Sequence, residues 1–213
     1  MKVGNTRRNM DPDFSELDAA LDDRDLDGYL IDADSTDSDQ YYLSGFDAPD
    51  PFLTLYDGEV HLLFSRSLEY GRAKKEARAD TVERHVDFGY QRKVEEYGPQ
   101  EGVSRVIAAF LDAYDVESVA VPPRFPLSTA DRLRDRGVTV ESDAESVITE
   151  IRATKTDEEI EHIETAQRAN EAAMAAAEEL LRESRTAAKG QLLYDGERVT
   201  SERIKEEIEV TLL

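Results

Sequence analysis

Residues 52–64, FLTLYDGEVHLLF, give the clearest local pattern in the sequence. Two apolar runs rich in β-forming side chains flank Asp57 and Gly58. Asp-Gly is a preferred dipeptide of the tight type I′ turn that joins antiparallel strands, because both residues tolerate a positive φ. The stretch therefore predicts a β-hairpin, and with it an antiparallel pair of strands within the fold.

This hairpin lies inside an alternation of predicted helices and strands. Before it, Asp11-Pro12 is typical of the N-cap and first position of a helix, and DGYLIDA (residues 27–33) predicts a buried strand ending at Asp32. After it, the pattern predicts helix 67–79, strand 81–86, helix 99–115, strand 118–122, helix 128–137 and strand 138–142. An alternation with one hairpin inside it predicts an α/β fold, a mixed β-sheet flanked by helices.

The same patterns divide the chain into three parts. Residues 1–11 are predicted to be a disordered leader, residues 12–150 the α/β domain, and residues 151–213 the beginning of a second domain. Thr156 and Glu159 have the spacing of a capping box at a helix N-terminus.

An apolar stripe of mostly small side chains follows that capping box for about seven turns. It consists of Ile160, Ile163, Ala166, Ala173, Ala177 and Leu180. After a second Asp-Gly turn at residues 194–197, Thr200 or Ser201 caps a further helix with no termination signal before Leu213. We therefore expect the second domain to be incomplete.

The charge of the chain excludes some partners. It has 48 acidic and 26 basic side chains, a formal net charge of −22 at pH 7. A field of this sign repels phosphate backbones, so we expect no nucleic-acid partner. No apolar run approaches the roughly 18 residues of a membrane span, and no apolar segment follows the basic N-terminus. The sequence predicts a soluble, cytoplasmic protein. Because the acids are spread along the chain and Lys is scarce beside Arg, it also favours the acidic surface of a halophilic protein.

The same charge predicts that folding depends on salt. The Debye length is about 10 Å at 0.1 M ionic strength, so the carboxylates still repel one another in dilute buffer. We expect the midpoint of thermal unfolding to rise from dilute buffer to molar KCl. A midpoint that stays flat across that series would remove the halophilic interpretation.

Isolated chemistry-bearing residues do not predict a catalytic or metal site. The absence of cysteine excludes disulfides, thiolate metal ligands and a cysteine nucleophile. Asp32 and Asp34 have a spacing that suits a divalent cation, but the segment is so rich in aspartate that composition explains it. His61, His85 and His162 lie far apart, and none belongs to an H-E-x-x-H pattern. The phosphate-binding G-x-x-x-x-G-K-[ST] and nucleophilic G-x-S-x-G patterns are absent as well.

Residues 39–46, DQYYLSGF, follow a very polar run and place aromatic side chains around Ser44-Gly45. Two interpretations stay open on the residues alone. The segment is either a strand that bends at Gly45 or an aromatic loop at the rim of a cleft.

Two segments, at a suitable distance from each other, resemble one family. DQYYLSGF is similar to the N-x-x-Y-L-T-G-F segment in the creatinase/prolidase-type N-terminal domain of the pita-bread metallopeptidases, with Asp39 in place of Asn and Ser44 in place of Thr. Residues 151–174 resemble the R-x-x-K-x-x-x-E-I-x-x-I-x-x-A stretch at which the catalytic domain of these enzymes begins. The matching positions are Arg152, Lys155, Glu159, Ile160, Ile163 and Ala166. The resemblance covers roughly residues 12–213.

This resemblance implies an Xaa-Pro peptidase, either an aminopeptidase or a prolidase-like dipeptidase, that hydrolyses the bond before proline in short peptides. It implies two divalent ions, Mn, Co or Zn, in the full-length protein, held by two Asp, one His and two Glu of the catalytic domain. No catalytic or metal-binding residue is expected in the present chain, which is predicted to be inactive alone. With the acidic composition, a haloarchaeal source is expected.

The resemblance further implies a homodimer in which the N-terminal domain overhangs the partner's active site and limits substrate length. On that basis Tyr42, Gly45 and Phe46 are the predicted substrate-gate residues. Two alternatives remain: a non-enzymatic α/β dimerisation and interaction module, and a creatinase-like amidinohydrolase. A reading frame that continues past Leu213 into Asp, His and Glu at metal-ligand spacing would favour the peptidase, and a natural stop would favour the interaction module.

Overall fold

The computed structural model describes residues 12–213, which form two compact units, residues 12–154 and residues 155–213. The predicted leader, with Asp11, lies outside the described residues. Helix α7 (Val147–Ala153) crosses the predicted domain boundary at residues 150 and 151. Its side chains Ile148 and Ile151 are buried in the core of the first unit, which is why that unit extends to Thr154.

The first unit is built from six strands and several helices. The strands are β1 (Gly28–Ala33), β2 (Phe52–Tyr56), β3 (Val60–Phe64), β4 (Thr81–Arg84), β5 (Ser118–Val121) and β6 (Thr139–Ser142). The helices are α1 (Ser15–Asp22), α2 (Ser38–Ser44), α3 (Tyr70–Glu76), the 3-10 turn η2 (His85–Phe88), α4 (Tyr90–Tyr97), α5 (Pro99–Asp112), α6 (Leu127–Arg134) and α7.

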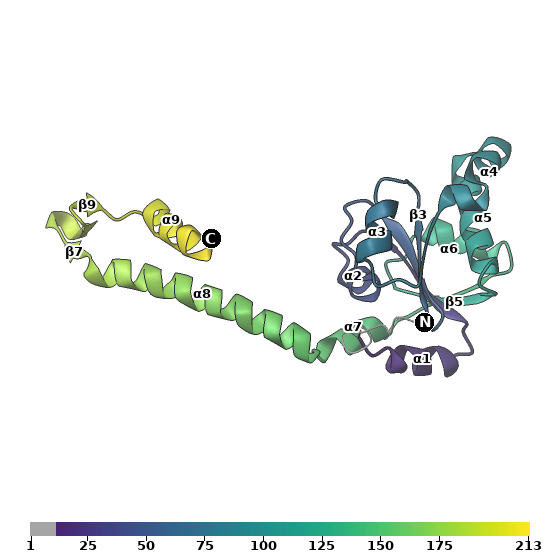
Figure 1. The fold of residues 1–213 in the computed structure, drawn as a ribbon, viewed down its shortest axis with the longest axis horizontal. Helices are drawn as coiled ribbons and strands as arrows, with labels where there is room; N and C mark the ends of the chain where they lie inside the picture. The colour runs from purple at the N-terminus through teal and green to yellow at the C-terminus, as the bar shows by residue number, and fades with distance from the viewer. Residues whose placement is uncertain (1–11) are drawn as a thin grey trace, which may run out of the picture. The chain divides into compact units, whose positions relative to one another are not determined.

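All six strands join one mixed sheet, which has helices on both sides (Figure 1). The strand order is β4-β3-β2-β1-β5-β6. The pairs β1–β2 and β2–β3 are antiparallel, whereas β3–β4, β1–β5 and β5–β6 are parallel. The predicted mixed sheet flanked by helices is confirmed.

Both faces of the sheet are buried under helices. Because side chains alternate along a strand, Tyr29 and Ile31 of β1 join one apolar cluster while Leu30 joins the other. Helices α1, α2, α3 and α7 cover the first face, and α5 and α6 cover the second. This double coverage explains why β2 and β3 are buried along their whole length and do not show a half-exposed alternation.

The hairpin forms as predicted, but its turn is of another type. Tyr56 pairs with Val60, so three residues, 57–59, connect the strands. Only Gly58 has a positive φ, 99°, whereas a type I′ turn requires positive φ at two central residues. Asp57 instead accepts the backbone N–H of Glu59 at 3.1 Å with its carboxylate, which is its usual role in turns.

Four helices depart from the predictions, and one of them is α7, which has no counterpart among the predicted elements. Helix α1 begins at Ser15, a few residues after Pro12. Helix α4 was not predicted, because its residues are mostly polar and none of them is buried. Residues 39–44 belong to helix α2, so the strand and the loop interpretations of DQYYLSGF are both wrong. The helix forms there because Asp37 caps its start and Gly45, with a φ of 60°, ends it.

The second unit contains the long helix α8 (Asp157–Glu183), a small sheet of β7 (Arg185–Thr186), β8 (Leu192–Tyr194) and β9 (Glu197–Arg198), the turn η3 (Ala188–Gly190) and helix α9 (Ser201–Leu212). The predicted capping box is confirmed: Thr156 Oγ1 accepts the Glu159 N–H at 3.2 Å, and Glu159 Oε2 accepts the Thr156 N–H at 2.8 Å. Asp195 (φ 51°) and Gly196 (φ 85°) form the two-residue turn with two positive φ angles between β8 and β9.

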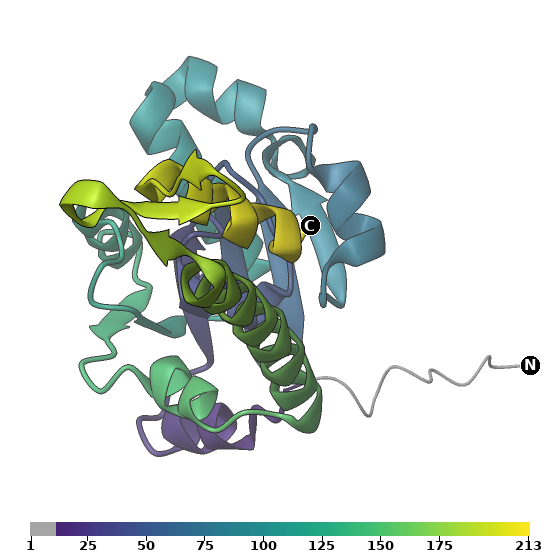
Figure 2. The same ribbon diagram turned by 90° about the vertical axis from the view of Figure 1, so that its left-hand side faces the viewer.

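Helix α9 folds back against α8 (Figure 2). Ala173, Ala177 and Leu180 of the predicted stripe are buried, whereas Ile160 and Ile163 near the start of α8 stay exposed. Among the helices that the structure describes, none combines the length and apolar content that a membrane crossing needs.

Candidate functional site

A hollow of about 560 Å³ opens in the first unit near the ends of two neighbouring parallel strands, β1 and β5. Ligands of open α/β sheets bind in the crevice beyond the carboxyl ends of such strands. We call it the β1–β5 pocket and treat it as the candidate site. It is lined by Ala33, Asp34, Thr36, Asp37, Ser38, Asp39, Pro51, Arg124, Thr149 and Arg152.

Asp39 is the most buried carboxylate of the β1–β5 pocket and has partners on two other segments. Only 4% of it is exposed, yet it accepts hydrogen bonds from Arg124 Nη2 at 2.9 Å and from Arg152 Nη1 at 2.7 Å. The Thr149 hydroxyl lies 3.2 Å from Asp39 Oδ1. A buried carboxylate needs such partners, because an unpaired charge away from water is costly. Since Arg124 follows β5 and the other two donors lie on α7, Asp39 ties helix α2 to both segments.

Asp37 shares Arg124 with Asp39. Its Oδ1 accepts the backbone N–H groups of Asp39 at 3.0 Å and Gln40 at 3.1 Å, which have no partner within the helix. Arg124 donates to Asp37 from both Nε and Nη2. Burial alone would raise the pKa of Asp37, but the hydrogen bonds from Arg124 and Gln40 outweigh it and hold that pKa below its usual value. The Arg124 guanidinium therefore bridges two carboxylates.

The chemistry of this pocket suits positioning better than bond cleavage. Both buried carboxylates are engaged by guanidinium groups, and the lining side chains include no histidine, lysine or tyrosine. Of the two arginines that bind these carboxylates, Arg124 is the more accessible, since 53% of its side chain is exposed. The cluster can hold α2, the segment after β5 and α7 in one arrangement while presenting charge to a ligand at its mouth.

The predicted gate residues lie at the far end of α2 from Asp37. Tyr42 and Phe46 are 7% and 1% exposed, and both belong to the apolar core beneath α1, α2, α3 and α7. A Cβ at Gly45 would lie 2.7 Å from Arg78 Nε. The two aromatic side chains are therefore not at an open rim of this unit. They anchor α2, so they could affect gating only by holding that helix in place.

The other residues singled out in the sequence lie apart from the pocket or on its edge. Asp34 lines the pocket and accepts two hydrogen bonds from Thr36, which hold its pKa below the usual value, whereas burial raises the pKa of Asp32. His162 lies on an exposed part of α8.

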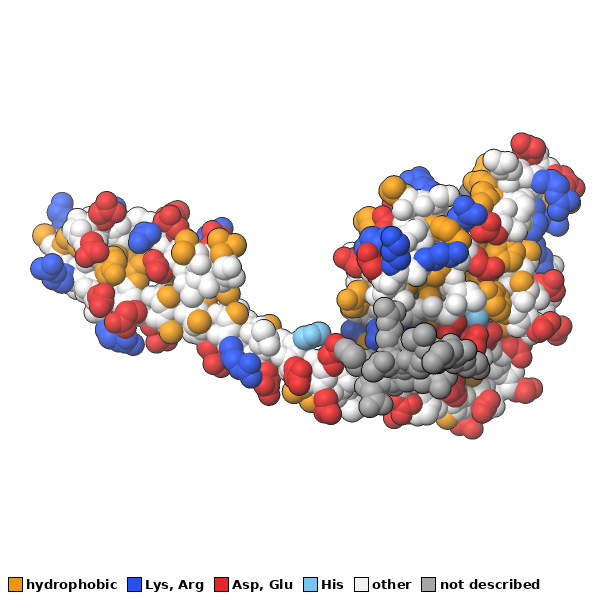
Figure 3. Space-filling model, viewed as in Figure 1, with side chains coloured by type: hydrophobic (Ala, Val, Ile, Leu, Met, Phe, Trp, Pro, Cys, Tyr) orange, Lys and Arg blue, Asp and Glu red, His pale blue; other side chains and the backbone are white. Residues whose placement is uncertain are grey.

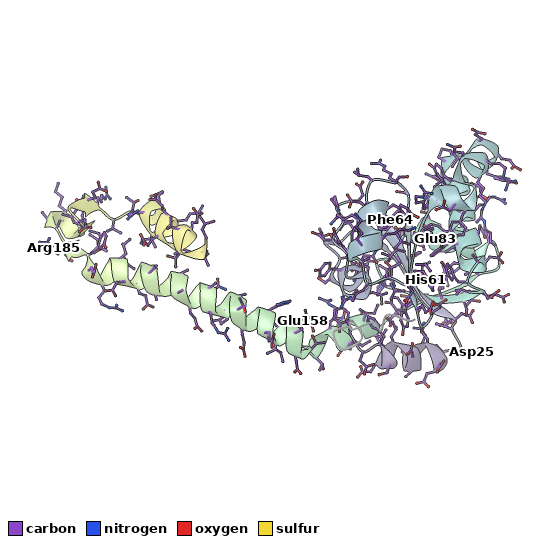
Figure 4. All side chains as sticks on the ribbon, viewed as in Figure 1. Asp25, His61, Phe64, Glu83, Glu158 and Arg185 are labelled. Carbon is purple, nitrogen blue, oxygen red and sulfur yellow. The ribbon has the colours of Figure 1, made fainter. Side chains whose placement is uncertain are left out.

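His61 is a buried histidine with partners on both ring nitrogens. Its Nε2 lies 2.9 Å from Asp57 Oδ1 and its Nδ1 lies 2.8 Å from Thr81 Oγ1. The Tyr114 hydroxyl continues the network from Thr81 and donates to Glu83 at 2.8 Å. Figure 4 labels His61 and Glu83 within the first unit. These contacts join the hairpin, β3, β4 and the segment after α5. The network therefore gives the buried His61 a structural role.

His85 gives the first unit a point of acid sensitivity. It is buried, its Nδ1 has no hydrogen-bond partner within residues 12–213, and burial lowers its pKa from 6.5 to about 4. Because the folded pKa lies below the unfolded one, the stability that His85 contributes is present above about pH 6.5 and is lost as the pH falls towards 4. Denaturant titrations should show the free energy of unfolding falling by about 2–3 kcal/mol over that range. A His85→Gln variant should lose this component, and an unchanged pH slope in the variant would contradict the assignment.

The two divalent ions implied by the family resemblance do not fit the residues present. Within residues 12–213, no group of three or more His, Asp or Glu side chains is arranged to hold a metal ion. The paired carboxylates of the β1–β5 pocket, Asp37 and Asp39, are already bound to arginines.

A family model described as the Creatinase/Prolidase N-terminal domain matches residues 14–154. Solved structures similar to this chain include the prolidase from Pyrococcus furiosus, with 20% identity and a TM-score of 0.57 over 93% of this chain and 53% of that one. The Xaa-Pro dipeptidase from Bacillus anthracis has 15% identity and a TM-score of 0.61, over 93% of this chain and 47% of that one. The dipeptidase PepE from Mycobacterium ulcerans has 19% identity and a TM-score of 0.53, over 92% of this chain and 48% of that one.

At these identities the structural matches establish a shared fold. The chain spans about half the length of each of the three proteins. No protein of curated function matches this sequence.

Proposed function

Because this chain belongs to the family of creatinase/prolidase N-terminal domains, we propose that it is the N-terminal portion of an Xaa-Pro metallopeptidase. The whole protein would hydrolyse the bond before proline in short peptides, and two divalent ions outside the described residues would supply the hydroxide nucleophile. The observation that carries this proposal is the family match over residues 14–154, and the family-like motif from Arg152 to Ala166, which begins at the end of that range, supports it.

Within that protein, the first unit would serve dimerisation and control of access to the active site. The β1–β5 pocket supports this role, because its buried Asp39 fixes the position of α2 and α7 at once. Tyr42, Gly45 and Phe46 would contribute by anchoring and ending α2, and Arg124 would be the part exposed to peptide. The acidic surface would keep the domain hydrated in a salt-rich cytoplasm.

The gating role predicts a change in substrate-length preference. In a protein extended past Leu213, Arg124→Gln should release α2 from the segment after β5 and admit longer peptides. We expect the ratio of kcat/KM for an Xaa-Pro pentapeptide to that for an Xaa-Pro dipeptide to rise by about tenfold. The exposed Arg66, which lies 3.6 Å from Asp50, provides a charge-matched control as Arg66→Gln and should leave the ratio unchanged. An equal loss of activity towards both peptides in Arg124→Gln would contradict gating.

A further inference from the structure

A second hollow, of about 270 Å³, lies in the first unit between α4 and α5, beside the residues that follow α6. We call it the α4–α5 pocket. Four of its lining side chains are basic and one is acidic, whereas the whole chain has 26 basic and 48 acidic side chains. In the space-filling view, Lys and Arg side chains gather over α4 (Figure 3). The lining residues are Arg92, Lys93, Glu96, Tyr97, Arg105, Ala108 and Arg136.

The walls of the α4–α5 pocket are held rigidly by backbone contact. Helices α4 and α5 approach so closely that a Cβ at Gly102 would lie 2.7 Å from the Cα of Val94. This packing places Arg105 beside Tyr97, with the guanidinium carbon 3.7 Å from the ring centroid. The cationic groups are therefore brought together before any ligand arrives, which reduces the ordering cost of binding.

Carboxylates near the α4–α5 pocket leave its positive charge incompletely balanced. Glu101 accepts hydrogen bonds from Arg105 Nε at 3.0 Å and from Arg136, and Arg132 Nε lies 4.0 Å away. The hydrogen bond from Arg136 is the main reason that the pKa of Glu101 lies below its usual value. One carboxylate is thus shared by three guanidinium groups.

Two cations of the α4–α5 pocket lack an acidic partner among the described residues, and Arg136, which pairs with Glu101 through Nη2, has one further nitrogen without an acceptor. Within residues 12–213, neither Arg92 nor Lys93 forms an ion pair, and Arg136 Nε is buried without a hydrogen-bond acceptor. Lys93 Nζ donates to the Phe88 carbonyl, at 2.8 Å. Burial, and then the charges of Arg92 and Arg105, lower the pKa of Lys93. Crowded cations of this kind are stabilised by an anion that lies between them.

We propose that the α4–α5 pocket binds a small phosphate-bearing anion, held by Arg92, Lys93, Arg105 and Arg136. Guanidinium forks match the oxygens of a tetrahedral oxyanion, and an ammonium adds a point charge. A phosphate dianion offsets more of the local positive charge than a chloride or a single carboxylate does. The volume is several times the roughly 30 Å³ share of one water, so a phosphate group fits. A nucleic acid is disfavoured as the source, because the net charge of −22 repels a long polyanion.

The test is a titration of the 213-residue chain followed by NMR, at constant ionic strength in KCl. The Nε–Hε resonances of Arg105 and Arg136 should shift and saturate on addition of inorganic phosphate. A parallel titration with phenyl phosphate distinguishes the sources: tighter binding of the ester indicates an organic phosphate ligand, and tighter binding of the free ion indicates phosphate itself. Shifts that follow chloride equally well would overturn the proposal.

Variants locate the binding in the α4–α5 pocket. The double variant Arg92→Gln/Lys93→Gln should raise the Kd for phosphate by at least about tenfold, because two charge-assisted contacts are lost. The control Lys189→Gln/Arg198→Gln removes the same charge from exposed positions of the second unit and should leave the Kd unchanged. The single variant Arg92→Gln, whose side chain is exposed, should weaken binding without affecting folding. A Kd that is equal in the double variant, the single variant and the control would overturn the proposal.

Discussion

Replacing Phe46 by alanine should lower the free energy of unfolding of the first unit by about 3–5 kcal/mol, the cost of deleting a buried aromatic side chain. Phe46 is 1% exposed and makes edge contacts with Phe52 and Phe64 at centroid distances of 6.0 and 5.8 Å. The guanidinium of Arg72 lies 4.5 Å from its ring centroid on the outer side. Alanine would leave a cavity beside Phe52 and Phe64. Because these two rings are held by strands of the sheet, they cannot easily move to fill the cavity.

Denaturant titration of Phe46→Ala, in salt sufficient to fold the parent chain, measures this loss as a shift in midpoint without a change in m-value. Leu68→Ala is the matched control, because Leu68 is 81% exposed and its loss should change stability by less than about 0.5 kcal/mol. The experiment also separates two roles for Phe46. A loss below about 1 kcal/mol would contradict its place in the core and would favour an aromatic side chain at an open rim.

Local patterns were sufficient to predict most of the first unit. The run from Phe52 to Phe64 predicts the hairpin, and β1 and β5, which end at Ala33 and Val121, are each followed by polar or proline residues that stop a strand. Thr156 and Glu159 predict the start of α8, because a capping box is a short-range hydrogen-bond pattern. Each of these elements is determined by side chains that lie close together in the sequence.

Helix α2 shows where this kind of prediction stops. The aromatic residues of DQYYLSGF have no clear helical period over so few positions, and Gly45 is equally consistent with a bend in a strand. The pattern that could have identified the helix lies just before it, where Asp37 has the residue type and place of an N-cap. Reading that cap would have placed Gly45 at the C-terminus of a helix and predicted a buried Tyr42.

The β1–β5 pocket could not have been predicted from spacing. Arg124 and Arg152 meet Asp39 across 85 and 113 residues of sequence. Nothing local to Arg124 distinguishes it from the other arginines of an arginine-rich chain. Its position depends on β5 lying parallel to β1, because the two strands then end at the same edge of the sheet and the segments that follow them begin side by side. Arg152 and Asp39 each belong to one of the two family-like segments, but nothing in the sequence indicates that the two side chains pair.

Peptidase activity tests the central claim most directly: the first unit is an N-terminal domain whose catalytic residues lie outside the described chain. The 213-residue chain and a protein extended past Leu213 are each incubated with Mn, Co or Zn and with Ala-Pro and Xaa-Pro-Yaa substrates. A two-metal site needs ligands that hold its ions about 3.5–4 Å apart, and residues 12–213 contain no such cluster. We predict metal-dependent hydrolysis before proline by the extended protein and none by the 213-residue chain. Turnover by the shorter chain that survives repurification, or an inactive extended protein that binds its metals, would contradict the account.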